Sequence, residues 1–245
     1  MALCPRSIEA RKYKDSIEES LGLNVYRDVV ASPAGRRVSK KSRSSCRVIM
    51  CAPGMNVYLV FESLFERDCA IFFWAMPGVR SVEAQFGPIK YTDRYGIVRE
   101  HWADLRVVYE NGEVVLYCVR PANKDKRGLL KETVEDIRNY ALKYYAHRIE
   151  ILTEQVVSKA DIYRAREILS ARRLKNSPDC VRLLELLKTK TKPVRAFELV
   201  EEFGIEGDGW IALWNLMGDG SVEHVTKDEG LTFEPVSFVR ARKVN

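Results

Sequence analysis

The sequence has few of the features that mark secreted, membrane or zinc-binding proteins. Its six cysteines include no Cys-x-x-Cys pair and its three histidines do not lie at zinc-ligand spacing, so neither a zinc site nor a disulfide framework is expected. The most apolar run, Cys69 to Met76, is far too short to span a bilayer, and no apolar stretch follows a basic N-terminal region. Internal repeats are also missing. We therefore expect a soluble, unexported, cytoplasmic protein with no membrane partner.

Basic residues are modestly in excess and are unevenly distributed. The 245 residues include 40 Lys and Arg against 34 Asp and Glu, and the segment from Ala31 to Met50 contains no carboxylate at all. Its basic residues are Arg36, Arg37, Lys40, Lys41, Arg43 and Arg47. Double-stranded DNA is a natural partner for such an arm, so we predict that these side chains bind DNA; a solvated basic linker is the alternative interpretation.

The chain divides into three predicted parts. Residues 1–50 are expected to form an N-terminal helix, from Pro5 to Leu21, followed by the basic arm. Residues 51–176 are expected to form the largest domain, and residues 177–245 a small C-terminal domain. The last boundary falls at Asn176-Ser177-Pro178-Asp179, where Ser177 or Asp179 can cap a helix and Pro178 suits its first turn.

The central part alternates helical and strand-like patterns. A helix within Val57 to Met76 is apolar over most of its circumference and should be buried. Strands, a helix, a strand and a further helix follow, and the Asn111-Gly112 pair predicts a hairpin. The predicted ranges are Val79 to Thr92, Trp102 to Tyr109, Val114 to Val119, Leu129 to Tyr145, Ile149 to Thr153 and Ala160 to Arg173. This order predicts an α/β fold with a mixed sheet covered by helices on both sides.

The C-terminal part has the pattern of a winged helix. Three short helices, Cys180 to Leu187, Pro193 to Phe203 and Gly209 to Met217, precede two strands, Val222 to Val225 and Leu231 to Val239. The third helix offers only Asn215 for a base edge, whereas Trp210 and Trp214 suit a partner surface or the core. DNA contact by this part is therefore predicted at backbone phosphates, through Lys190, Lys192 and Arg195.

Three short motifs carry the candidate chemistry. They are Glu62-Ser63-Leu64-Phe65-Glu66, His101-Trp102-Ala103-Asp104 and Cys118-Val119-Arg120-Pro121, with Gln85-Phe86 between the first two. In this order they resemble the N-terminal endonuclease domain of TnsA-type transposon proteins. That family has Ser-x-x-Glu, Gln-Phe or Gln-Pro, His-x-x-Asp, and then Gln or Glu, one apolar residue and Lys-Pro. The resemblance covers Val57 to Pro121 and continues more faintly through Ile149 to Thr153.

The resemblance implies a restriction-endonuclease-like fold of the PD-(D/E)xK type and cleavage of DNA at transposon ends beside a transposase. By matching positions, Glu66 and Asp104 would be metal ligands, Cys118 would replace a Gln or Glu ligand, and Arg120 would replace the catalytic Lys. Glu62 lies four residues before Glu66 and is expected on the same helix face, where it could supply a substitute carboxylate. The implied cofactor of an active enzyme is Mg²⁺.

Two of the four positions depart from the family pattern. A thiol such as Cys118 is a soft ligand that Mg²⁺ does not favour. A guanidinium such as Arg120 can hold a phosphate but cannot give up a proton as a base. Taken singly, Glu66, Asp104 and His101 fit surface charges or polar strand ends, and only their joint occurrence favours a site. The sequence therefore predicts a nuclease-like domain whose chemistry is weakened.

Three functions remain open from the sequence. The leading one is a DNA-binding protein, catalytically impaired, that acts as a subunit or regulator in DNA transposition or recombination, with a transposase or ATPase as partner. The second is an active Mg²⁺-dependent endonuclease that nicks transposon ends. The third is an adaptor that binds a protein partner through the Trp-bearing helix and the basic arm. The sequence leaves the oligomeric state open.

Overall fold

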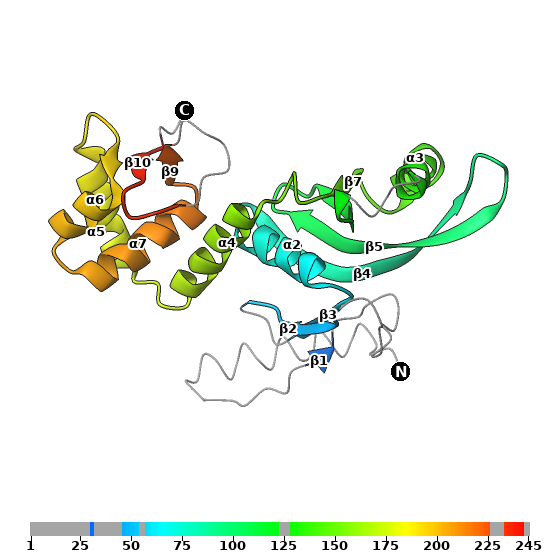
Figure 1. Ribbon diagram of the computed structural model, residues 1–245, viewed down its shortest axis with the longest axis horizontal. Helices are drawn as coiled ribbons and strands as arrows, with labels where there is room; N and C mark the ends of the chain where they lie inside the picture. The colour runs from blue at the N-terminus through cyan, green and yellow to red at the C-terminus, as the bar shows by residue number, and fades with distance from the viewer. Residues whose placement is uncertain (1–29, 32–45, 54–56, 123–127, 226–232, 243–245) are drawn as a thin grey trace.

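The computed structural model describes residues 30–31, 46–53, 57–122, 128–225 and 233–242. The predicted helix from Pro5 to Leu21 and the basic residues from Arg36 to Arg43 lie outside these ranges. Figure 1 shows a sheet with its helices in one half of the molecule and a small helical unit in the other, with α4 between them. None of the helices in the described ranges is both long and apolar enough to cross a membrane.

The main sheet has four strands in the order β4-β5-β6-β7. Strands β4 (Val79–Thr92), β5 (Val98–Tyr109) and β6 (Val114–Val119) form an antiparallel meander, and β7 (Arg148–Leu152) pairs with β6 in parallel. The chain returns to the parallel strand through α3 (Leu129–Tyr140) and a short 3₁₀ turn (Leu142–Tyr144). The predicted helix to Tyr145 therefore ends earlier.

Helices cover both faces of this sheet, as the sequence predicted. On one face, α2 (Leu64–Ala75) and α4 (Lys159–Arg172) pack on side chains such as Leu105 and Tyr117. On the other, α3 packs on Leu116 and Cys118. Five of the six β6 residues are buried, which is the expected pattern for a strand covered on both sides. The protein is thus a mixed α/β structure with a mixed sheet flanked by helices.

The first part of the predicted apolar helix is a strand instead. Residues Val57–Phe61 form β3, which pairs with β2 (Val48–Cys51) and with the short β1 (Val30–Ala31). The run Val-Tyr-Leu-Val-Phe is β-branched and aromatic, and these residues favour a pleated strand over a helix. Strand β2 also runs through the boundary predicted at residue 50.

The C-terminal unit contains α5 (Ser177–Lys188), α6 (Ala196–Phe203) and α7 (Glu206–Gly218) around one apolar core. Its small antiparallel sheet has the order β8-β10-β9 (Val194–Arg195, Phe238–Ala241, Val222–Val225). The predicted cap at Ser177 or Asp179 is wrong, because α5 begins after Asn176, which makes no capping side-chain bond; Pro178 does lie in the first turn.

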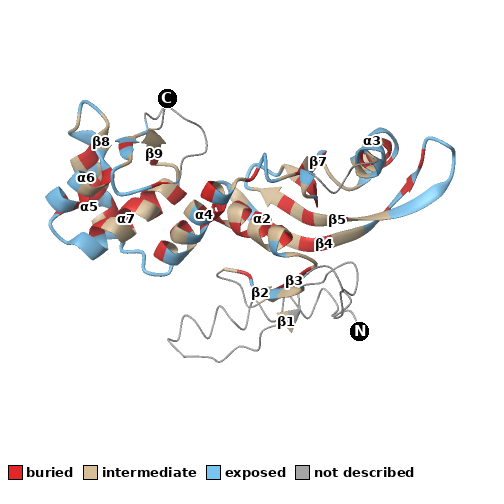
Figure 2. Cartoon of the chain, in the orientation of Figure 1, coloured by how far each residue is buried: buried red, intermediate tan, exposed pale blue. Residues whose placement is uncertain are grey.

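The two halves of the molecule meet where α4 crosses α7. The Asn215 amide, 3% exposed, donates to the Ala171 carbonyl, and the Arg172 guanidinium donates to the carbonyls of Trp74, Ala75 and Gly218. Figure 2 shows buried residues gathered along α2, α4 and α7. The prediction that Asn215 could read a base edge is therefore wrong, because its amide joins the two halves.

Gly218 makes this crossing close. A Cβ at Gly218 would overlap Ile168 of α4, so Gly218→Ala should lower the free energy of unfolding by about 1–3 kcal/mol. Gly207→Ala in the first turn of the same helix is a matched control, because a Cβ there meets nothing within 4 Å. Urea denaturation of both variants checks the prediction, and equal stability of the two would show that α4 and α7 do not pack this closely.

Candidate functional site

Glu66 lies in the first turn of α2 and is only 7% exposed. One carboxylate oxygen, Oε2, accepts from the Glu62 amide at 2.7 Å and from Gln85 Nε2 at 3.3 Å, while Oε1 accepts from the Ser63 hydroxyl at 2.9 Å. Burial raises the pKa of Glu66 above its usual range, although these hydrogen bonds oppose the shift. The carboxylate is thus held in one place by three donors.

Gln85 on β4 and Asp104 on β5 lie opposite each other, at the point where the side chains of both strands switch from one face of the sheet to the other. In a regular strand, side chains two residues apart point to the same face. Here Ala84 packs in the core under α2 while Phe86 packs against the core under α3, and Leu105 and Ala103 differ in the same way. Gln85 is 1% exposed and has a φ of 55°, a left-handed value that is uncommon for a residue with a Cβ.

At this switch the Asp104 side chain, and not a backbone carbonyl, accepts a hydrogen bond from the neighbouring strand. The pairing of β5 with β6 runs from Val108–Val114 to Leu105–Tyr117, and beyond it the amide of Val119 on β6 donates to Asp104 Oδ2 at 2.7 Å. Burial raises the pKa of Asp104 to about 7, with the nearby Glu66 carboxylate as the second cause. The Val119 hydrogen bond and Arg120 oppose that shift. Asp104 and Glu66 are therefore brought close enough to repel each other.

Cys118 lies on β6, on the same buried face as Ala103 and Leu116. Its sulfur is 3.3 Å from Nε2 of His101, the first residue of the His-x-x-Asp motif. Burial, and then the charge of Asp104, raise the pKa of the Cys118 thiol, so the group is a neutral thiol near pH 7. The structure thus gathers three motif residues, His101, Asp104 and Cys118, at neighbouring positions of two strands.

Arg120 follows the end of β6 and is exposed. Its backbone amide donates to the Leu152 carbonyl, and its guanidinium forms no ion pair within the described ranges. The positive charge of Arg120 partly opposes the rise of the pKa values of Asp104 and Cys118, so Arg120 lies within electrostatic reach of both groups. Arg120 is therefore able to contact an anion at the rim of the site.

Glu62 is not on the helix face shared with Glu66, so that prediction is wrong. The helix begins after its N-cap, Ser63, and Glu62 lies in the preceding bend, where its amide donates to Glu66. Its side chain pairs with Arg47 at 3.4 Å, and Arg47 also donates to the Glu62 carbonyl at 2.8 Å. Arg47, predicted to bind DNA with the arm, is thus fixed beside this bend.

The other predicted phosphate contacts lie in the C-terminal unit. Lys192 and Arg195 are exposed, and the Arg195 guanidinium lies 5.8 Å from the centre of the Phe238 ring. Lys190 is half-buried in an ion pair with Glu202 at 2.6 Å. Two of these three cations are therefore available to a phosphate, whereas the charge of Lys190 is already neutralised.

The residues present do not fit Mg²⁺ well. Glu66 is held by three donors and Asp104 has one oxygen bound to a backbone amide, while Cys118, which the resemblance would make the third ligand, has a neutral thiol that a hard cation does not favour. Within the described ranges no three His, Cys, Asp or Glu side chains are arranged to hold a metal ion.

The cap at Ser63 and the backbone of Gln85 are two local features of the site that the motifs alone do not predict. The Ser63-x-x-Glu66 spacing is also a helix-capping signature, and Ser63 Oγ does accept from the Glu66 amide at 3.2 Å. The motif therefore stabilises the start of α2, independently of any catalytic role of Glu66. The left-handed backbone of Gln85 had no such signal, because glutamine is not a residue type that marks positive φ.

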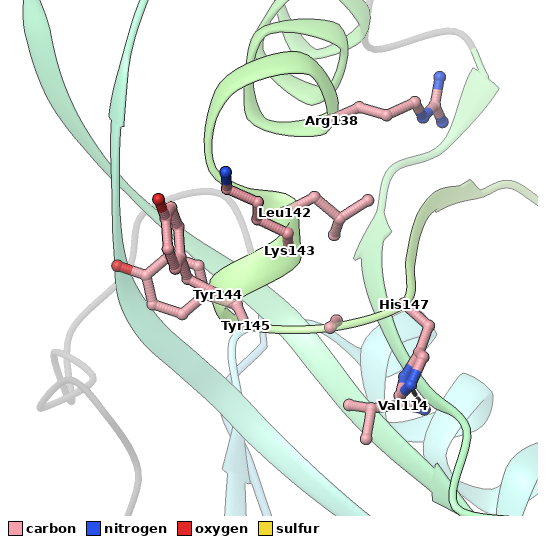
Figure 3. A pocket seen from close by; sticks show the side chains of 8 residues that line it. Val114, Arg138, Leu142, Lys143, Tyr144, Tyr145 and His147 are labelled. Carbon is pink, nitrogen blue, oxygen red and sulfur yellow. Dashed lines mark hydrogen bonds between the residues drawn. The ribbon is translucent and has the colours of Figure 1, made fainter.

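A surface pocket lies away from these residues, at the other end of β6. It has a volume of about 620 Å³ and is lined by Val114, Arg138, Leu142, Lys143, Tyr144, Tyr145, Ala146 and His147. In Figure 3 the hydroxyl ends of Tyr144 and Tyr145 point away from Arg138 and His147, so the polar groups do not converge on one point. Val114 and Cys118 lie towards opposite ends of β6, about 13 Å apart at 3.3 Å per residue.

The raised pKa of Asp104 predicts a specific dependence of stability on pH. A carboxyl whose pKa is higher in the folded state stabilises that state below its unfolded pKa, and this contribution is lost as the pH rises through about 7. From pH 5 to pH 8 the wild type should lose on the order of 1–3 kcal/mol relative to Asp104→Asn. Urea denaturation at both pH values measures this, and parallel losses would contradict it.

No protein-family model matches the chain, and no curated protein matches it significantly.

Proposed function

We propose that this chain is a DNA-binding protein whose central part has a TnsA-like, restriction-endonuclease-like fold with an impaired catalytic site. It would act in the cytoplasm as a subunit or regulator in DNA transposition or recombination, beside a transposase or ATPase subunit. One observation carries the proposal: Glu66 from α2, Cys118 from β6 and Arg120 just after β6 all lie within electrostatic reach of Asp104 on β5.

The order of elements supports the fold in this proposal. The order is a helix, three antiparallel strands, a helix and a parallel strand, α2-β4-β5-β6-α3-β7, with Asp104 on β5 and Arg120 just after the end of the neighbouring β6. The C-terminal order of helices and strands, with β8 joined to β10 and β10 to β9, supports a winged helix in the same proposal. Fold alone does not fix function, so the proposal depends on the site.

The chemistry of the site supports binding over cleavage. Arg120 is exposed and can clamp a phosphate, which requires only its charge. Cleavage in the family needs a third oxygen ligand and a lysine, where this chain has Cys118 and Arg120. Without those two groups the site would bind a metal more weakly and would lack a lysine for proton transfer, while Arg120 keeps a positive charge.

Substitution of the arm tests the DNA-binding half of the proposal. Replacing Arg36, Arg37, Lys40 and Lys41 by Ala should weaken binding to double-stranded DNA and flatten the slope of log K against log salt, by about 0.9 for each phosphate that the arm neutralises in the wild type. Asp104→Ala should leave binding nearly unchanged. Gel shift at several salt concentrations measures both variants, and an unchanged slope for the arm variant would remove the arm from the interface.

Restoring the family pattern tests the catalytic half. Cys118→Gln with Arg120→Lys should create or raise Mg²⁺-dependent nicking of supercoiled plasmid, since it supplies an oxygen ligand and a lysine. Asp104→Ala added to that background should abolish the nicking. Absence of nicking in the restored protein would mean that more than these two positions has diverged.

An active Mg²⁺-dependent endonuclease remains the second candidate, because the Glu66 and Asp104 carboxylates are both retained and adjacent. The same plasmid assay with the wild type in Mg²⁺ and in Mn²⁺ separates the two candidates. Nicking that disappears in Asp104→Ala would make this chain an enzyme despite Cys118 and Arg120.

A further inference from the structure

A groove of about 520 Å³ lies on the C-terminal unit between α6 and α7. Its lining residues are Phe197, Val200, Glu201, Gly204, Glu206 and Trp210. Half of them are apolar, two are carboxylates, and none is basic. The lining of the groove therefore combines an apolar surface with negative charge.

The apolar part of the groove is set by the close crossing of the two helices. A Cβ at Gly209 of α7 would lie 3.0 Å from Val200 Cγ1 and 3.2 Å from Phe203 Cδ1, so the two helices pack tightly at this glycine. Trp210, the next residue, is half-buried and packs against the core of the unit. Part of the indole therefore remains available beside Phe197 to receive an apolar side chain.

The charged side chains of the two helices that form the groove are all acidic. Helices α6 and α7 together contain Glu198, Glu201, Glu202, Glu206 and Asp208, and no Lys or Arg. Glu202 is paired with Lys190. Glu201 and Glu206 are exposed, and neither is in an ion pair within the part of the chain that the structure describes. The Arg182 guanidinium nearby is stacked on the Phe203 ring at 3.7 Å and donates to the Phe203 carbonyl.

These charges argue against DNA as the occupant. A phosphate backbone would face two unpaired carboxylates and no cation from α7, the helix that would enter a DNA groove in a winged helix. The one side chain of α7 suited to a base edge, Asn215, is buried against α4. A protein segment with Lys or Arg complements the rim, and an apolar side chain complements Phe197, Val200 and Trp210.

We propose that the groove between α6 and α7 binds a protein segment in which one apolar side chain is flanked by Lys or Arg residues. The apolar side chain lies against Trp210 and Phe197, and the flanking cations face Glu201 and Glu206. This inference goes beyond the proposed function and does not depend on the nuclease-like site.

Synthetic peptides with the full-length chain test the proposal. The probes are fluorescein-labelled eleven-residue peptides with a central Phe between Lys-Arg pairs, the same peptide with Glu-Asp pairs, and the basic peptide with Ser in place of Phe. Fluorescence anisotropy at low salt should show the basic Phe peptide binding at least tenfold more tightly than either of the others.

Two sets of variants assign the binding to the groove. Glu201→Gln with Glu206→Gln should weaken the basic Phe peptide about five- to tenfold and reduce its salt dependence, because two exposed charges are removed without a change of shape. Glu110→Gln, at an exposed glutamate in the turn between β5 and β6 that forms no ion pair within the described residues, is the control and should bind as the wild type does. Trp210→Phe should reduce the preference for Phe over Ser, with thermal unfolding confirming that the variant folds.

Equal binding of the basic and acidic peptides would overturn the proposal, as would normal peptide binding by the double glutamine variant. Displacement of the peptide by a short DNA duplex in the wild type, with unchanged displacement in the arm variant, would assign the groove to DNA instead. Because the glutamine variants should leave DNA binding by the rest of the chain unchanged, failure here and failure of the proposed DNA-binding function are distinguishable.

Discussion

The buried carboxylate of Glu66 is the point at which the bend before α2, the start of that helix and strand β4 are joined. Its three donors come from Glu62, Ser63 and Gln85, so moving the carboxylate would disturb all of these segments. Because the charge is poorly solvated, it also acts on its surroundings: it helps to raise the pKa of Asp104 to about 7. The properties of the neighbouring strand therefore depend on where this one group is fixed.

The thiol of Cys118 suits such a site when no cation balances it. A third carboxylate beside Glu66 and Asp104 would add another buried negative charge, which costs several kcal/mol unless it is compensated. A neutral thiol adds none, and its contact with His101 gives the sulfur a polar neighbour. Because Asp104 is partly protonated near pH 7, the repulsion between the Asp104 and Glu66 carboxyl groups is reduced in the absence of a cation. A thiol at position 118 thus favours the structure without a metal, and it is a poor ligand for a hard cation.

The sequence predicted the features that follow from regular periodicity and turn chemistry, such as the Asn111-Gly112 hairpin, β6 and α4. It did not predict features that depend on tertiary contacts. The apolar residues of β3 directly precede α2, so the sequence pattern does not separate the strand from the helix. Strand β8 has only two residues, which is too short to show a periodicity. The face switch at Gln85 and Asp104 replaces backbone pairing by a side chain, which no periodicity reveals. A combination of motifs predicts the residues of the candidate site, whereas the hydrogen bonds of Ser63, Glu66 and Asp104 are seen only in the structure.

Helix α7 carries two different contacts on separate faces. Glu206 and Trp210 are four residues apart and line the groove, whereas Asn215 and Gly218 are three apart and face α4. Arg172 extends the second contact by binding the carbonyls of Trp74 and Ala75 at the end of α2, the helix that begins at the Glu66 site. Helix α2 has 12 residues, about 18 Å at 1.5 Å per residue. A segment bound in the groove is therefore held at a fixed position relative to Glu66 and Asp104, since each link between them is a helix or a buried hydrogen bond.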